Sequence, residues 1–127
     1  MSSFPSTEWL ELAALAIAED PQFERTSRAF DATIRFDFGD DAYAVTVDET
    51  DLTVHEDPTF VGWDFALRAP EDTWRKMFSE TPSPLHHDLL GAWLRGPMTI
   101  EGDLKTAIQH IRPLKRMLVV FQEVNHD

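Results

Sequence analysis

Hydrophobic residues recur with a helical period at the start of the chain and with a period of two from residue 31 onward. A helix is expected within residues 1–22, where Ser6 or Thr7 can cap its first turn. Four strands are expected within residues 31–68, because apolar and polar side chains alternate and turn residues separate the runs. Closely spaced strands of this kind predict an antiparallel meander.

The period returns to that of a helix after residue 69. Two helices are expected within residues 70–95, and a short fifth strand is expected over residues 98–101. The order of one helix, four strands, two helices, one strand and one helix predicts an α+β fold. We expect a single domain over residues 1–127, in which helices pack on one face of a five-stranded, mainly antiparallel sheet.

The last helix is expected over residues 103–123, where Asp103 is well placed to cap the first turn. Pro113 removes one hydrogen bond inside this helix and is expected to bend or break it near residues 109–112. The half beyond Pro113 is apolar on nearly every side except at two basic residues. A helix end that apolar must be buried against the sheet, a ligand or a second subunit. We therefore expect this helix to be the movable cover of a binding site.

The chain carries 23 acidic and 11 basic residues, which gives a formal net charge of −12. Such a surface repels nucleic acid and anionic membranes on average, so no nucleic-acid partner is expected. The basic residues Lys105, Arg112, Lys115 and Arg116 cluster on the predicted last helix. We interpret them as a solvated face whose charges suit the C-terminal end of the helix dipole.

Three features of the sequence bear on where the protein works. Its apolar runs are too short to span a bilayer, and its first residues lack the basic and apolar pattern of a signal peptide. Cysteine is absent, which excludes disulfides and thiolate chemistry. We expect a cytoplasmic protein without integral membrane association.

Candidate catalytic and metal-binding groups are sparse. His86 and His87 are adjacent, so on a helix their rings point about 100° apart and are poorly placed to share one metal ion. Acidic pairs such as Glu56-Asp57 lie at expected turns or helix ends, where carboxylates have structural roles. The motifs of zinc hydrolases, phosphate-binding loops and serine nucleophile elbows are absent from the sequence. We therefore expect no catalysis, no metal and no cofactor.

A large apolar surface remains on the predicted helices and on one face of the sheet. Periodicity does not distinguish a filled core from a hollow one, but Met and Trp side chains are suitable walls for an apolar cavity. The candidate lining residues are Phe36, Trp63, Phe65, Trp74, Met77, Phe78, Leu89, Leu90, Trp93, Leu114, Leu118 and Phe121.

The order and spacing of these segments resemble the sterol carrier protein type 2 family. Its strands are matched by residues 32–37, 43–47 and 63–67, and a helix that bears Trp74 follows. The most specific piece is residues 96–103, with the sequence GPMTIEGD.

The resemblance implies a tunnel between the sheet and the C-terminal helices that binds a fatty acyl chain, a sterol or a similar hydrophobic molecule. It also implies lipid transfer without catalysis. The alternative is an accessory module that forms a homodimer or delivers substrate to a separate lipid- or steroid-processing enzyme. We expect the binding or transfer function and keep the accessory module as the alternative.

Overall fold

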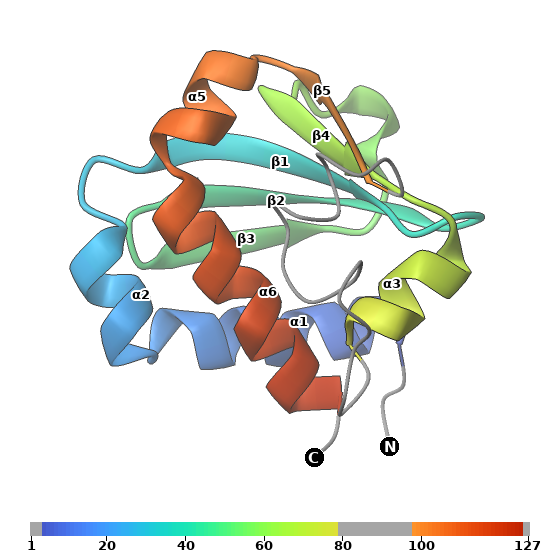
Figure 1. Cartoon of the computed structure of the whole chain (residues 1–127), viewed down its shortest axis with the longest axis horizontal. Coiled ribbons are helices and arrows are strands. Elements are labelled where there is room, and N and C mark those ends of the chain that lie inside the picture. The colour runs from blue at the N-terminus through green and yellow to red at the C-terminus, as the bar shows by residue number, and fades with distance from the viewer. Residues whose placement is uncertain (1–3, 79–97, 126–127) are drawn as a thin grey trace.

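The structure is a computed structural model that describes residues 4–78 and 98–125. Its fold is α+β, with helices covering one face of a five-stranded sheet in the order β3-β2-β1-β4-β5 (Figure 1). The predicted fold class is confirmed. The strands are β1 (Asp31–Asp37), β2 (Ala42–Asp48), β3 (Asp51–His55), β4 (Phe65–Arg68) and β5 (Thr99–Gly102).

The first three strands form antiparallel hairpins, as predicted, with Phe36 opposite Tyr43 in the pairing of β1 with β2. The fourth strand does not continue this meander. β4 lies on the other side of β1 and runs parallel to it, with Ile34 opposite Phe65. The prediction of a four-strand meander over residues 31–68 is therefore wrong in its last step. Alternation along a strand reports which side chains are buried, but it does not report which strand is the neighbour.

The connection from β3 to β4 crosses the outer face of the sheet, because these strands lie on opposite sides of the β1–β2 pair. This connection includes the 3-10 helix η1 (Pro58–Phe60), which contacts β2. Ala44 and Ala66 alternate with the inward-facing residues, yet both are fully buried. Small side chains at these two positions leave room for the crossing segment.

Asp64 fixes the end of this crossing to the sheet. Its backbone N–H donates to the Thr33 carbonyl at 2.8 Å, and its carboxylate accepts the Thr33 N–H at 2.7 Å. Its carbonyl accepts the N–H of Asp103 at 2.8 Å. Asp103 in turn caps the following helix by accepting the N–H of Thr106 at 3.1 Å. The start of the C-terminal helical segment is thereby held at the edge of the sheet.

The helix predicted within residues 1–22 is α1 (Thr7–Ala18), and a second short helix, α2 (Pro21–Thr26), follows it. The Ser6 hydroxyl caps α1 by accepting the N–H of Trp9 at 3.1 Å. The Asp20 carboxylate caps α2 by accepting the N–H of Phe23 at 2.8 Å. A proline at the first helical position needs no intrahelical hydrogen bond from its nitrogen, so Asp20-Pro21 starts a second helix instead of only ending the first.

The C-terminal helix predicted over residues 103–123 is also divided, into α5 (Leu104–Gln109) and α6 (Ile111–Asn125). The predicted break is present at His110, whose ring stacks on Phe30 with centroids 4.8 Å apart. Pro113 therefore lies in the first turn of α6, where a missing N–H is tolerated, and it does not bend a continuous helix.

One more helix, α3 (Glu71–Met77), follows β4, as the sequence predicts for the first half of residues 70–95. The second helix of that pair falls within residues 79–97, which lie outside the described residues. The fifth strand is confirmed one residue later than predicted, at Thr99–Gly102.

Candidate hydrophobic ligand site

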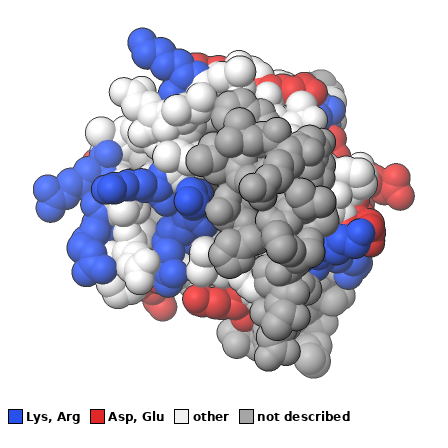
Figure 2. All heavy atoms as spheres, viewed as in Figure 1, with Lys and Arg blue, Asp and Glu red and all other residues white. Residues whose placement is uncertain are grey.

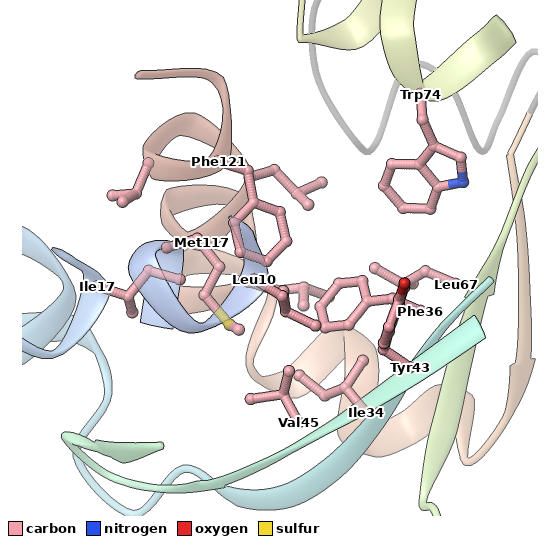
Figure 3. Packing of buried hydrophobic residues seen from close by; sticks show 14 of the residues in the cluster. Leu10, Ile17, Ile34, Phe36, Tyr43, Val45, Leu67, Trp74, Met117 and Phe121 are labelled. Carbon is pink, nitrogen blue, oxygen red and sulfur yellow. The ribbon is translucent and has the colours of Figure 1, made fainter. Parts of the chain in front are cut away.

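Aromatic side chains from the sheet, α3 and α6 meet between these layers. Figure 3 shows Trp74 and Phe121 pointing toward the sheet from α3 and α6, with Phe36 of β1 facing them. The centroid of the Phe36 ring lies 6.3 Å from that of Trp74 and 5.4 Å from that of Phe121. All three residues are fully buried or nearly so. Side chains from β1, α3 and α6 therefore meet in one apolar cluster.

The N-terminal segment completes this cluster with Phe4 and Trp9. Neither residue is among the lining residues predicted from the sequence. The Trp9 ring of α1 lies 5.3 Å from Phe121 and 5.9 Å from Phe78, centroid to centroid. The Phe4 ring lies 4.8 Å from Phe38 and 4.9 Å from Trp9. Trp9 stands at helical spacing with the other apolar residues of α1, so its burial was predictable, but periodicity gave no sign that α1 packs beside α6.

The two buried indoles of the cluster differ in their hydrogen bonding. Trp74 Nε1 donates to the backbone carbonyl of Asp37 at 2.7 Å. Trp9 is only 1% exposed, yet its Nε1 has no hydrogen-bond partner in the part of the chain that the structure describes. A buried donor without an acceptor is destabilising by about 1–3 kcal/mol. The Trp9 N–H is therefore a polar group that remains open to a partner inside an apolar environment.

Most of the predicted lining residues that the structure describes lie together in the core. Trp63 is the exception: it is partly exposed and lies outside the cluster, because it precedes β4 and reaches the backbone near Gly102. Leu89, Leu90 and Trp93 lie outside the described residues. The residues that are buried in one cluster are Phe36, Phe65, Trp74, Met77, Phe78, Leu114, Leu118 and Phe121.

The described part of the cluster is packed, since its neighbouring rings are in contact. Phe78 lies 5.7 Å from Trp74 and 5.9 Å from Phe121, which are ordinary distances between aromatic ring centroids. A ligand that enters between these rings must therefore displace side chains or a helix. Because α6 supplies Phe121 and α3 supplies Trp74, displacement of either helix would open this space.

A charged contact holds α6 to the start of α2. Two guanidinium nitrogens of Arg116 donate to the two carboxylate oxygens of Asp20, at 2.8 Å and 2.7 Å. These hydrogen bonds hold the pKa of Asp20 below its usual range and raise the pKa of Arg116. Bidentate pairs of this kind are directional. The contact fixes one edge of α6, and the rest of the helix is held by apolar packing on α1 and α2.

A hydroxyl and an imidazole meet on the opposite face of the sheet. Thr46 Oγ1 lies 2.9 Å from His55 Nε2 and 3.0 Å from Thr33 Oγ1. The three side chains form a chain of hydrogen bonds across neighbouring strands, and no hydrogen bond to a carboxylate orients the ring in the described structure. Nucleophilic catalysis commonly uses such a third group. We interpret the chain as a cross-strand contact that stabilises the sheet.

Two kinds of feature are absent from the described ranges, 4–78 and 98–125. Within them, His, Asp and Glu form no group of three or more that is placed to hold a metal ion. Within them, also, every helix is too short or too polar to cross a membrane. His86 and His87 lie outside these ranges, so the absence of a metal remains a prediction.

This combination of sheet order and covering helices is the fold of sterol carrier protein 2. No family model matches the sequence, and no curated protein sequence does. The chain is similar to a crystal structure of sterol carrier protein 2, with a TM-score of 0.70 and 14% identity over 93% of this chain and 96% of that one. The predicted resemblance is confirmed at the level of the fold.

Two further solved structures have the same fold. A conserved hypothetical protein of Thermus thermophilus, described as possibly a sterol carrier protein, matches with a TM-score of 0.70 and 16% identity, over 97% of this chain and 92% of that one. The ubiquinone synthesis protein UbiJ-SCP2 matches with a TM-score of 0.58 and 16% identity, over 87% and 90% of the two chains.

Proposed function

We propose that this protein binds and transfers a hydrophobic small molecule, such as a fatty acid or a sterol, between the sheet and the helices α3 and α6. The observation that carries the proposal is the Nε1 of Trp9, which lacks a partner among the described residues inside the aromatic cluster. The fold supports it, since a structure of this fold belongs to a sterol carrier protein. The protein acts in this role without catalysis and in the cytoplasm.

The Trp9 donor narrows the chemistry of the ligand. A pure hydrocarbon would leave this N–H without an acceptor, whereas a carboxylate or hydroxyl oxygen would accept its hydrogen bond. Trp74 has no such capacity, because its N–H already donates to Asp37. The proposed ligand is therefore amphipathic, with its oxygen at Trp9 and its apolar body among the rings.

The apolar body of the ligand would be lined from the helical side by Trp74, Phe78, Leu90, Trp93, Leu114 and Leu118, as proposed from the sequence. The described rings are in contact, and we propose that α6 moves to admit the ligand. The junction at His110 is the natural hinge, because the helical hydrogen-bond ladder is interrupted there. Deleting α6 would not test this idea cleanly, since Leu114 and Phe121 also belong to the core.

Titration with a fluorescent fatty acid tests the proposed function. We expect saturable binding of one molecule per chain by the unmodified protein. Trp9→Phe is expected to weaken binding about 5–10-fold, because one hydrogen bond to the ligand is lost. Trp74→Phe is the matched control: it makes the same ring change at a buried indole whose donor is already satisfied, so its loss of affinity should be smaller.

Two results, from that titration and from lipid extraction of the purified protein, would contradict the proposal. If the unmodified protein binds neither fatty acid nor sterol, and organic extraction of the purified protein yields no lipid, the carrier function is wrong. If binding occurs but Trp9→Phe and Trp74→Phe weaken it equally, Trp9 is not the polar anchor and the ligand lies elsewhere.

The second candidate function is the accessory module, acting as a dimer or beside a lipid-processing enzyme. One neighbour of the same fold is a ubiquinone synthesis protein, which is the observation that favours it. Under this alternative, the apolar face of α6 would be covered by another protein surface. The protection of the α6 amides from hydrogen exchange would then depend on protein concentration.

A further inference from the structure

Basic side chains gather on one surface of this acidic protein. Figure 2 shows Lys and Arg side chains over α2 and α6, on the left of the view. Between these helices lies a surface hollow of about 270 Å³, lined by Gln22, Thr26, Arg112, Lys115 and Arg116. We call Arg25, Arg112, Lys115 and Arg116, together with this hollow, the basic surface.

Most of the basic surface is not neutralised by the protein itself. Arg116 is paired with Asp20, and its contact with Glu123 is longer, at 3.9 Å. Arg25, Arg112 and Lys115 form no ion pair in the described structure, whereas Arg68 and Arg75 elsewhere on the surface are both paired. Residues 104–122 include four basic and no acidic side chains, within a chain of net charge −12. This cluster of positive charge is therefore unusual in a protein whose overall charge is strongly negative.

The helix dipole accounts for Arg25, which lies in the last turn of α2, but not for Arg112 and Lys115 of α6, contrary to the interpretation from the sequence. Because α6 starts anew at Ile111, Arg112 lies in its first turn and Lys115 in its second. The N-terminal end of a helix carries partial positive charge, so cations there are disfavoured. The last turn of α6 has no basic residue. The unfavourable position of Arg112, with Lys115 near it and no ion pair to either in the described structure, points to an anionic partner outside the fold.

Exposed apolar side chains lie on the helix that leads into this surface. Leu104 is 40% and Ile108 is 50% exposed, and both are on α5, four residues apart and therefore on one helix face. Lys105 stands beside Leu104 on the same helix. Apolar residues flanked by cations are typical of segments that lie in the interface of an anionic bilayer.

We propose that the basic surface, with Leu104 and Ile108, docks on a membrane that contains anionic phospholipids. The phosphate groups of the lipids would bind in the hollow between α2 and α6. The side chains of Leu104 and Ile108 would enter the headgroup region of the bilayer. The inference rests on the proposed carrier function, because it places the outer side of α6 at the bilayer while its inner side covers the ligand site. Nucleic acid is a less suitable partner for this surface, since it offers no apolar region that could bury Leu104 and Ile108.

Sedimentation with vesicles tests the docking. The unmodified protein is expected to bind vesicles of phosphatidylcholine and phosphatidylglycerol at low salt, to bind pure phosphatidylcholine vesicles much more weakly, and to dissociate in high salt. Arg112→Glu combined with Lys115→Glu is expected to weaken binding by at least about 25-fold, since each cation at an anionic surface contributes about fivefold. The fluorescent fatty-acid affinity of this variant, measured without vesicles, should stay unchanged.

A single substitution provides the matched control. Lys115→Glu and Lys76→Glu change the net charge equally, but Lys76 lies on α3 and pairs with Asp72. Only Lys115→Glu should weaken vesicle binding. Equal losses for the two variants would show that overall charge, not this surface, governs binding and would overturn the proposal.

Three other results would also overturn the proposed membrane docking without contradicting the carrier function. These are equal binding to neutral and anionic vesicles, binding of inorganic phosphate without binding of vesicles, and binding of duplex DNA instead of vesicles. Loss of fatty-acid binding by the unmodified protein is a separate result, which bears on the carrier function alone.

Discussion

Replacing Trp74 by alanine is expected to lower the free energy of unfolding by about 3–5 kcal/mol, the range found when large buried aromatic side chains are truncated. Trp74 is fully buried and contacts the rings of Phe36, Phe38 and Phe78. Its N–H also donates to the carbonyl of Asp37, which ties α3 to the end of β1. The substitution therefore removes both a central part of the cluster and the contact that positions α3. Denaturant unfolding followed by circular dichroism measures the change.

The control for this substitution lies two residues away on the same helix. Lys76 is largely exposed and its ion pair with Asp72 is on the surface. Lys76→Ala should change stability by no more than about 0.5 kcal/mol. A loss below about 1 kcal/mol for Trp74→Ala would show that α3 does not pack on the sheet as described here, and that the cluster is not a unit.

Replacing Gly102 by alanine is expected to destabilise the fold by about 2–5 kcal/mol, through backbone strain and overpacking together. Gly102 has φ +92°, a region that residues with a Cβ rarely adopt. A Cβ there would lie 2.6 Å from the Asp64 carbonyl oxygen and 3.1 Å from the Cα of Phe65, both backbone atoms. The close approach of β5 to β4 leaves no space for a side chain, so the backbone must shift.

Gly62→Ala is the matched control for this prediction, because a Cβ at Gly62 would meet nothing within 4 Å. It should fold normally and unfold within about 0.5 kcal/mol of the unmodified protein. If Gly102→Ala is tolerated equally well, the junction between β5 and α5 is looser than the structure indicates.

Regular periodicity made much of this fold predictable. Alternation located β1 and β2, and the capping residues Ser6 and Asp103 located the starts of α1 and α5 within one residue. These signals are local, since a strand's buried face and a helix's first turn depend on neighbouring residues. These signals can therefore be recognised in the sequence without knowledge of the tertiary structure.

The errors concern features that local signals do not contain. The pairing of β4 with β1 depends on a crossing that the small side chains of Ala44 and Ala66 permit, and a sequence does not show which strands such residues bring together. Trp63 was assigned to the cluster because it alternates with Phe65, but alternation does not show where the covering helices end. The break at His110 placed the cations of α6 at the opposite helix end from the one expected.

The candidate site was predicted in part for the same reason. Helical spacing placed Trp74 on the apolar face of its helix, and Phe121 lies in the apolar half of the last helix. The structure brings both residues to the same cluster as Phe36. The contributions of Phe4 and Trp9 required knowledge of where the N-terminal segment packs. The open hydrogen-bond donor of Trp9 is visible only in three dimensions, because it depends on the absence of an acceptor among all of its described neighbours.

Hydrogen exchange of α6, with and without a saturating fatty acid, tests most directly whether this helix covers a ligand site. The amides of Ile111–Asn125 should exchange more slowly when the fatty acid is present, equally at high and low protein concentration, while those of β2 change less. The opposite result is exchange in α6 that does not respond to the fatty acid and becomes faster only when the protein is diluted. That result would make α6 a contact between protein chains and would contradict the carrier function proposed here.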